Sequence, residues 1–356
     1  MIPFFSLARQ YRALRRELTR AYQETCDAGV YILGKNVAAF EKEFAEYIGV
    51  AHAVGVASGT DALTLAVRAL GLGKGDEVLV PANSYPTVFG VAQAGVSIRL
   101  VDCQEDGTVS PSDVVRRITP KVRAIVAVHL YGNHADVVGL KRVIPKRIRV
   151  IEDAAQYHKK NSGLAGDIGI YSFYPTKNLG ALGDGGMVVT RSSGIASRVR
   201  GLRMYGEKIR YKSTEVSGVS RLDELQAAFL RIKLRHLDRW NNKRRDLAVR
   251  YIQKLGGVRG LSIVPATDDS CYHLFVIRTH RRRALQAYLA SRHIGSAIHY
   301  PHPIHLTPAF TYLGYKRGNF PMAEALAREV LSLPFFPEMT HKGIDHVARV
   351  IVQWSS

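Results

Sequence analysis

The stretch that decides the fold is RVIEDAAQ, residues 149–156, an apolar strand that ends in two acidic residues. Short β-branched runs of the same kind recur on both sides of it, and helical patterns lie between most of them. We expect strands at residues 77–80, 97–101, 124–129, 149–152, 168–173 and 187–190. Strands that alternate with helices and are apolar almost throughout form parallel sheets covered on both faces. The sequence therefore predicts an α/β fold with a mainly parallel sheet.

The pattern changes after residue 254. A strand-like run at 271–278 is followed by a helix near 283–293 and by loops rich in proline and histidine. At about 150 residues per domain, a chain of 356 residues corresponds to about two domains. We expect residues 1–245 to form a large domain and residues 246–356 a smaller C-terminal one.

Composition excludes several classes of protein. Apolar residues make up 46% and charged residues 22% of the chain, which is the globular range and not that of a disordered or collagen-like chain. No apolar run approaches the roughly 20 residues that cross a bilayer, and the N-terminus turns polar too early for a signal-peptide core. The three cysteines are far apart and odd in number. This usage predicts no disulfide framework, a reducing cytoplasmic location and no membrane partner.

The net charge of +20 permits either a nucleic-acid binder or an enzyme that acts on anionic substrates. Half of the surplus lies in residues 198–254, which hold 16 basic and 6 acidic residues. Within this stretch, apolar residues recur at helical spacing from Asp223 to Lys254, which predicts one long amphipathic helix with a solvated basic face. No nucleic-acid motif accompanies the charge, so we expect no nucleic-acid partner.

Two segments could bind an anion and a cation, respectively. Ser58, Gly59 and Thr60 precede a predicted helix, whose first N–H groups suit a phosphate, although an ordinary helix cap has the same composition. Asp153 leaves the end of an apolar strand, where ligands bind in α/β sheets. Its carboxylate could act as a base, hold a metal, hold a protonated ring nitrogen or cap a loop.

Two further segments complete a pattern. Lys177 ends a constrained turn after a predicted strand and precedes a glycine-rich loop. A lysine beside a cleft can form a Schiff base with a carbonyl, whereas most lysines are surface groups. Tyr85 follows another strand, where its ring could stack on a flat ligand or simply pack. A phosphate site, a carboxylate, a lysine and an aromatic ring together fit pyridoxal phosphate (PLP).

With these motifs the chain resembles the DegT/DnrJ/EryC1/StrS family of PLP-dependent sugar aminotransferases, over nearly its whole length. The matching segments are residues 58–63, 75–78, 129–132, 152–156, 172–186, 220–228, 299–301, 308–310 and 331–334. The resemblance implies the fold of aspartate aminotransferase (PLP fold type I). In that fold a mainly parallel seven-stranded sheet lies between helices in the large domain, and a small C-terminal α+β domain follows.

The resemblance also implies roles for individual residues. Lys177 would form the Schiff base with the cofactor and move protons, and Asp153 would pair with the protonated ring nitrogen. Further cofactor contacts would come from Gly59, Thr60, Tyr85, Gln156, Ser172 and Ser220. Substrate contacts are expected from His158, Tyr174, Arg210, Tyr211, His299 and His305. No metal is expected, and the site would lie at a homodimer interface.

The chain departs from the family pattern at two places. The stretch before Leu222 reads SGVSR, residues 217–221, where the family usually has an asparagine that touches the partner's cofactor phosphate. Ser220 is expected to stand in for it. The loop between Gln156 and Gly166 also differs and is short, and it lies near the substrate in this family.

The implied reaction moves an amino group from L-glutamate to a nucleotide-linked keto sugar. The pattern around Tyr205 and Tyr211 resembles the branch that aminates C3 of dTDP-3-oxo-6-deoxyhexoses. The alternatives are a 4-keto nucleotide-sugar or aminocyclitol aminotransferase, and a regulatory module that binds PLP without turnover. Dehydratases among the relatives carry histidine at the position of Lys177, which argues against that branch.

Overall fold

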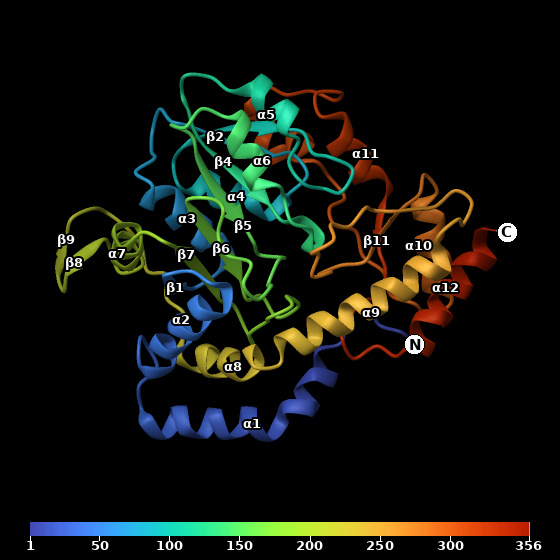
Figure 1. Cartoon of the computed structure of the whole chain (residues 1–356), viewed down its shortest axis with the longest axis horizontal. Helices are drawn as coiled ribbons and strands as arrows, with labels where there is room; N and C mark the ends of the chain where they lie inside the picture. The colour runs from blue at the N-terminus through green and yellow to red at the C-terminus, as the bar shows by residue number, and fades with distance from the viewer. Residues whose placement is uncertain (356) are drawn as a thin grey trace.

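The computed structural model describes residues 1–355, and its centre is a seven-stranded sheet (Figure 1). The strands are β1 (His52–Val56), β2 (Glu77–Pro81), β3 (Ser97–Val101), β4 (Val122–Val128), β5 (Arg149–Asp153), β6 (Ile168–Ser172) and β7 (Gly186–Thr190). Their order is β1-β7-β6-β5-β4-β2-β3. Strands β2 to β6 run parallel to one another, whereas β7 runs antiparallel to both β1 and β6. The predicted α/β fold with a mainly parallel sheet is confirmed.

Helices cover both faces of this sheet. Because side chains alternate along a strand, Val78 and Val80 of β2 join the core beneath α3 (Gly59–Ala69) and α4 (Tyr85–Gln93). Leu79, between them, joins the opposite core beneath α5 (Pro111–Arg117) and α6 (Val137–Val143). The remaining helices of this part are α1 (Leu7–Ala28), α2 (Lys35–Ile48), α7 (Ser193–Leu202) and α8 (Glu224–Leu234).

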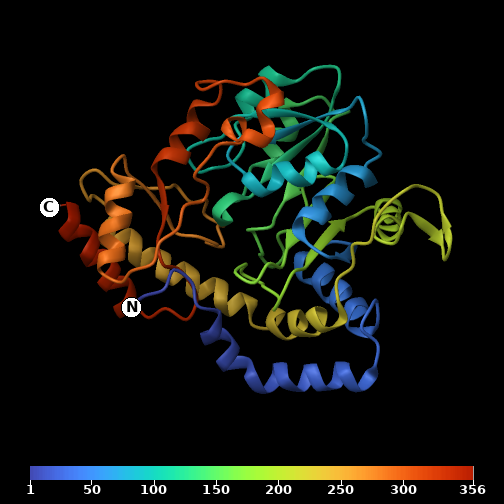
Figure 2. The same ribbon diagram turned by 180° about the vertical axis from the view of Figure 1, so that it is seen from behind.

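The C-terminal part has its own sheet and its own core. Strands β10 (Ser262–Ile263), β11 (Val276–Arg278) and β12 (Val330–Ser332) form an antiparallel sheet. The helices are α9 (Leu237–Leu255), α10 (Arg282–Ser291), α11 (Pro321–Glu329) and α12 (His341–Ser355). Figure 2 shows α9 running from the large sheet into this part, beside α12. The predicted division after residue 245 falls inside α9 and stays a prediction.

The prediction of one helix from Asp223 to Lys254 was wrong. The chain turns at Arg235 and His236, so that α8 and α9 are separate helices. The basic face is also only partly solvated, because Lys233 and Arg244 are each 1% exposed. The Lys233 ammonium donates to the carbonyl of Gly180, and Arg244 donates to the carbonyls of Tyr272, His273 and Phe335. Helical periodicity does not show which cations the fold will bury.

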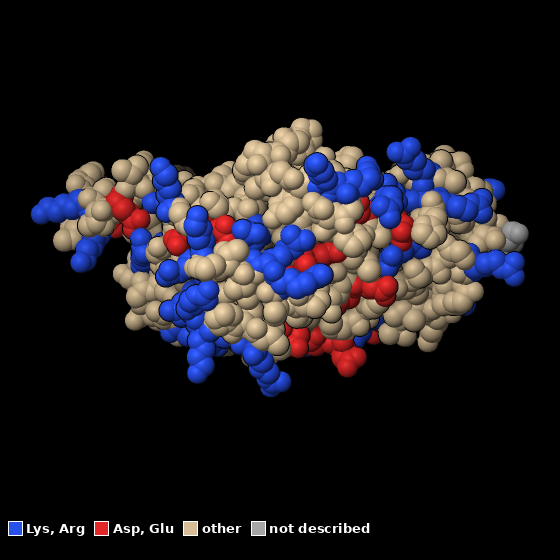
Figure 3. Space-filling model, turned by 90° about the horizontal axis from the view of Figure 1, so that it is seen from above, with Lys and Arg blue, Asp and Glu red and all other residues tan. Residues whose placement is uncertain are grey.

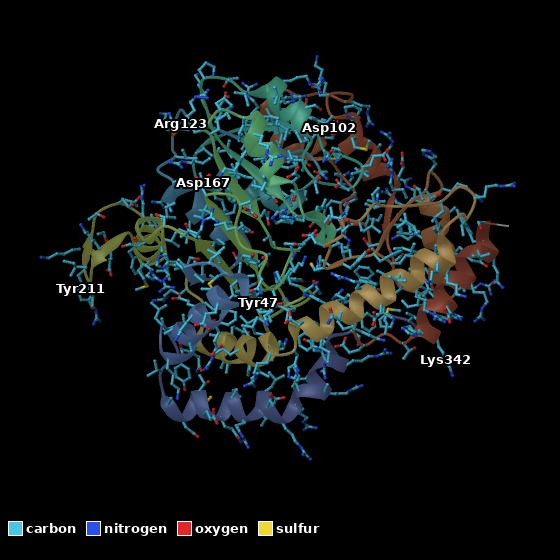
Figure 4. All side chains as sticks on the ribbon, in the orientation of Figure 1. Tyr47, Asp102, Arg123, Asp167, Tyr211 and Lys342 are labelled. Atoms are coloured by element: carbon cyan, nitrogen blue, oxygen red, sulfur yellow. The ribbon has the colours of Figure 1, made fainter. Side chains whose placement is uncertain are left out.

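A short hairpin protrudes from the body beyond α7. It consists of β8 (Glu207–Ile209) and β9 (Lys212–Ser213), with Tyr211 at its tip (Figure 4). Its apolar side chains are unusually open, since Ile209 is 65% and Tyr211 81% exposed. No helix in the described part of the chain is both long and apolar enough to span a membrane.

Helix α2 receives its N-terminal cap from a distant helix. Its N-cap residue, Gly34, has no side chain to accept a hydrogen bond. The buried carboxylate of Glu224, at the start of α8, accepts the N–H groups of Asn36 and Val37 at 2.8 Å each. One carboxylate therefore satisfies two helix N–H groups and joins two helices that are far apart in the sequence.

We predict that Glu224→Gln destabilises the chain by about 2 kcal/mol or more, because the amide can accept only one of these N–H groups and brings an NH₂ against the other. Thermal unfolding of the full chain measures the change as a lower midpoint. Glu46→Gln, at an exposed position on α2, is the matched control and should leave the midpoint unchanged. Equal midpoints for the two variants would contradict this account of the cap.

Candidate functional site

The polar residues predicted from the sequence meet at one edge of the large sheet. Asp153 is the last residue of β5, where it lies opposite Val128 of β4 and Ile170 of β6. The segment with Lys177 follows β6, and Ser84 follows β2 and precedes α4. Together with the N-terminus of α3 they surround a cavity of about 340 Å³. Ligands bind at this edge in α/β proteins.

Lys177 is held in the cavity wall by a tight turn. Its N–H donates to the carbonyl of Tyr174 at 2.8 Å, and the N–H of Ala181 returns to the carbonyl of Phe173. A side chain at Gly180 would lie only 2.3 Å from the carbonyl oxygen of Pro175, so the turn requires glycine there. Burial lowers the pKa of Lys177 to about 8, and the charge of Asp153 acts in the opposite direction. The amine is therefore partly neutral just above neutral pH.

The Asp153 carboxylate is 6% exposed and is oriented by two donors. Thr87 donates its hydroxyl to Oδ2 at 2.7 Å, and the N–H of Ala155 donates to Oδ1 at 3.1 Å. Since the single hydroxyl hydrogen of Thr87 goes to Asp153, Ser84 is the donor in its 2.6 Å contact with Thr87. The remaining lone pairs of Asp153 can accept from a cationic N–H group in the cavity.

The start of α3 forms a polar cradle on another wall. Ser58 caps the helix by accepting the N–H of Asp61 at 3.0 Å, while the N–H groups of the first helical residues have no partner within the helix. A Cβ at Gly59 would lie 2.6 Å from the Cβ of Ser172, so the two segments can approach only because residue 59 is glycine. Free N–H groups, two hydroxyls and a helix N-terminus suit a phosphate group.

Gln156 and Tyr300 form a further part of the wall. The Gln156 side-chain oxygen accepts the N–H of Tyr131 at 2.7 Å, which leaves its NH₂ group to donate toward the cavity and the Tyr300 hydroxyl. The ring of Tyr85, which is 38% exposed, lies beside Tyr300 with 6.2 Å between the ring centres.

Asp153 is also supported by the residue before it. Glu152 accepts the N–H of Gly166 and a hydrogen bond from His129 Nε2 at 3.1 Å. The other ring nitrogen of His129 accepts the N–H of Ala135, so His129 donates through Nε2 and has no free lone pair for a metal. His129 and Glu152 therefore support the end of β5, whereas the nearby His134 lies 3.3 Å from Asp269.

The structure brings most of the predicted residues together and leaves the others elsewhere. The cavity is lined by Gly59, Thr60, Asp153, Gln156, Ser172, Tyr174, Lys177 and His299. Ser220 lies behind α3, where its hydroxyl donates to Asp61 and accepts the N–H of Ala57. Arg210 and Tyr211 are on the β8–β9 hairpin, outside the cavity.

Two predicted histidines lie inside the protein and not in the cavity. His158 is fully buried; its Nδ1 accepts the N–H of Leu179, and burial together with nearby cations lowers its pKa to about 3. His305 is 2% exposed and pairs with Glu324 at 3.0 Å. Both histidines therefore form hydrogen bonds with other residues of the chain, outside the cavity.

Polar residues of the cavity wall that were not predicted as site residues include Thr87, Asp184, His273 and Tyr300. Thr87 lies two residues after the predicted Tyr85, and Tyr300 follows the predicted His299. His273 lies in a strand-like run that carries no motif, so only the fold reveals it. Of the described residues that line the cavity, Lys177 alone is a lysine or arginine.

The chain is similar to known aminotransferases over its full length. The family model described as the DegT/DnrJ/EryC1/StrS aminotransferase family matches residues 12–352. The dTDP-3-amino-3,4,6-trideoxy-alpha-D-glucose transaminase of Streptomyces venezuelae is 42% identical over 99% of this chain and 96% of that protein.

Solved structures show the same fold. The crystal structure of DesV from S. venezuelae in complex with a ketimine intermediate is 41% identical, with a TM-score of 0.96, and covers 100% of this chain and 98% of that one. The structure of ntda from Bacillus subtilis with bound cofactor PMP is 27% identical, with a TM-score of 0.89, over 98% of this chain and 85% of that one.

The donor set of the cavity fits the phosphorylated pyridine cofactor of such enzymes. The glycine cradle between Gly59 and Ser172 suits its phosphate, and the carboxylate of Asp153 suits a protonated ring nitrogen. Lys177 supplies an amine of lowered pKa in the same cavity. The phosphate, the ring nitrogen and the carbonyl of the cofactor thus each have a chemically suitable partner in this chain.

We predict that Lys177 loses its proton near pH 8, because burial disfavours the ammonium form, whereas an exposed lysine does so near its ordinary value of about 10.5. Amine labelling of the cofactor-free chain across a pH series, quantified by mass spectrometry, measures this titration. Lys342 on α12 is the exposed control (Figure 4). Identical labelling profiles for the two lysines would contradict the expected shift.

Proposed function

The chain belongs to the DegT/DnrJ/EryC1/StrS aminotransferase family, and we propose that it moves an amino group from L-glutamate to C3 of a nucleotide-linked keto sugar. The observation that carries the proposal is that the half-buried Lys177 side chain and the oriented carboxylate of Asp153 line the same cavity. The full-length similarity to a dTDP-3-amino sugar transaminase supports a dTDP-3-oxo-6-deoxyhexose as the acceptor.

The protein is a PLP-dependent aminotransferase, and the cavity supplies suitable residues for binding the cofactor. Gly59, Thr60 and Ser172 would hold the phosphate, and Asp153 the protonated ring nitrogen. When bound, the cofactor supplies an electron-accepting ring and carries the amino group between the two substrates. The hydrogen bonds from Thr87 and Ala155 keep the Asp153 carboxylate aimed into the cavity.

Lys177 would move protons during transfer. An amine with a pKa of about 8 can give up a proton and take it back near neutral pH, as a general acid–base catalyst must. Gln156 and Tyr300, which are 3.4 Å apart, form part of the same cavity wall.

The test is a half-reaction screen. The unmodified protein, isolated with its cofactor, should convert to the amine form with L-glutamate and then aminate 3-keto nucleotide sugars in preference to 4-keto ones. Lys177→Ala should abolish both steps together with the visible absorbance of the lysine-bound cofactor. The aminated carbon is identified by NMR of the product.

The alternatives give different results in the same screen. Preferred amination of C4 or of a ketocyclitol would move the assignment to another branch of the family. Absorbance without any glutamate-dependent conversion would indicate a regulatory module that binds PLP without turnover.

We further propose that two copies of the chain complete each other's sites. The cavity lining contains two acidic residues and one lysine, which is a poor environment for a substrate with a diphosphate. The exposed hairpin, in contrast, carries Lys208, Arg210 and Lys212 beside the open side chains of Ile209 and Tyr211. Such an arm suits contact with a second copy, and its cations suit a diphosphate near the second copy's cavity.

We predict that replacing Lys208, Arg210 and Lys212 together by glutamine raises the KM for the nucleotide sugar and weakens its salt dependence, because attraction to the diphosphate is removed. The glutamate half-reaction measures the integrity of the cavity in the same protein. Mixed dimers of this variant with Lys177→Ala should regain part of the lost activity, since one composite site is then intact. An unchanged KM and salt dependence would refute the role of the hairpin.

We also infer a cytoplasmic location. Cys26, Cys103 and Cys271 are all free thiols, which fits a reducing compartment.

A further inference from the structure

His273 lines the cavity beside Lys177, although no sequence motif singled it out. It lies in the segment that leads into β11, and its side chain is almost fully buried at 6% exposure. One ring nitrogen, Nδ1, is 3.1 Å from the side-chain oxygen of Asn178, the residue after Lys177. No other described residue hydrogen-bonds the ring.

A chain of hydrogen bonds determines which ring nitrogen carries the proton. The carbonyl of His158 can only accept, so the NH₂ group of Asn241 donates to it at 2.7 Å. The Asn241 oxygen then accepts from the NH₂ group of Asn178 at 2.9 Å. The same NH₂ group donates to the carbonyl of Cys271 at 3.0 Å, which independently fixes the orientation of the Asn178 amide.

The Asn178 oxygen therefore faces His273 and can only accept a hydrogen bond. His273 must donate to it through Nδ1–H, which leaves Nε2 without a proton. His273, which lines the cavity, thus has a lone pair on Nε2, and this tautomer is fixed by two backbone carbonyls through the side chains of Asn241 and Asn178.

The surroundings also keep His273 uncharged. The titratable groups whose charges act on it are Lys177, Arg244, His299 and His158, and each of them disfavours the charged ring. Burial acts in the same direction and is the largest cause, so the pKa of His273 lies well below its ordinary value. His299, on the same cavity wall, has its pKa lowered to about 4 for the same reasons.

An obligate acceptor can serve only a ligand that donates. The amino donor, a dicarboxylate, presents carboxylates that repel a lone pair, and its one donating group is the amine that reacts. A keto sugar presents hydroxyl groups, which donate readily. Nε2 can therefore accept a hydrogen bond from a hydroxyl group of the keto sugar but not from the carboxylates of the amino donor.

We propose that His273 is the hydrogen-bond acceptor for a hydroxyl group of the sugar substrate, and that Asn178 positions it by fixing its tautomer. This assignment rests on the proposed function. It makes His273 a residue that selects for a hydroxyl-bearing acceptor, because a sugar without that hydroxyl would leave Nε2 unpaired in a buried site.

The first experiment observes the tautomer directly. Histidine-selective ¹⁵N NMR of the full chain with its cofactor should show one ring that remains neutral and protonated on Nδ1 from about pH 8 down to about pH 6. The signal should vanish in His273→Gln and shift to the Nε2–H tautomer in Asn178→Ala. His346→Gln, at an exposed position on α12, is the matched control and should leave the signal unchanged.

The second experiment compares the half-reactions. His273→Phe keeps the size of the ring and removes the acceptor, so kcat/KM for the keto sugar should fall about tenfold or more. The glutamate half-reaction should change by less than about twofold, since no hydrogen bond to it is lost. His273→Gln, whose side-chain oxygen can accept, should recover part of the loss for the sugar.

Three results would overturn the assignment while the proposed function stands. They are an Nε2–H tautomer in the unmodified chain, a ring that titrates at the usual pH, and equal losses in both half-reactions of His273→Phe. Failure of the unmodified chain to aminate any keto sugar would instead overturn the proposed function, and this assignment with it.

Discussion

The site depends on one constraint, which is that a single amine must be kept in a poorly solvated cavity without being paired tightly enough to fix its charge. Burial lowers the pKa of Lys177 to about 8, while the carboxylate of Asp153 opposes that shift from across the cavity. A direct ion pair would hold the lysine protonated, and burial without any carboxylate would lower its pKa further. Asp153 is instead engaged by Thr87 and Ala155, so it influences the amine through its field and keeps lone pairs for a ligand.

The order of the strands makes this arrangement possible. Because β5 lies between β4 and β6, the end of β5 is adjacent to the turn that follows β6, and Asp153 and Lys177 open into one cavity. The antiparallel β7 returns beside β6, so that Gly186 passes close to Ser58 and brings the start of α3 to the same edge. Helices α8 and α9 then support this turn from behind. Asn241 of α9 accepts a hydrogen bond from Asn178, and Lys233 of α8 donates one to the carbonyl of Gly180.

Features that depend on a local sequence pattern were predictable from the sequence, whereas features that depend on contacts between distant residues were not. Strands β2 to β7 were predicted within about two residues at each end, because each is rich in apolar residues that the sheet buries. Strand β1, HAVGV at residues 52–56, was not predicted; β6 has the same length and also contains glycine, so neither property explains the omission. Lys177 and Asp153 were recognised because their neighbours form motifs. His273 and the caps supplied by Glu224 depend on contacts between residues far apart in the chain, which no local pattern encodes.

The chain has a net charge of +20, but the balance of basic and acidic residues differs between the surface and the cavity. Figure 3 shows Lys and Arg spread over one face with Asp and Glu between them, and no continuous basic stripe of the kind that follows a nucleic acid. In the cavity the balance reverses, with one lysine against Asp153 and Asp184, and the histidines His273 and His299 are kept neutral by burial. A low-dielectric site cannot hold many like charges without shifting their pKa values. The proposed contact with a diphosphate therefore places its cations on the exposed hairpin, where water screens them from one another, and leaves the neutral ring of His273 in the cavity to accept a hydrogen bond from a hydroxyl group.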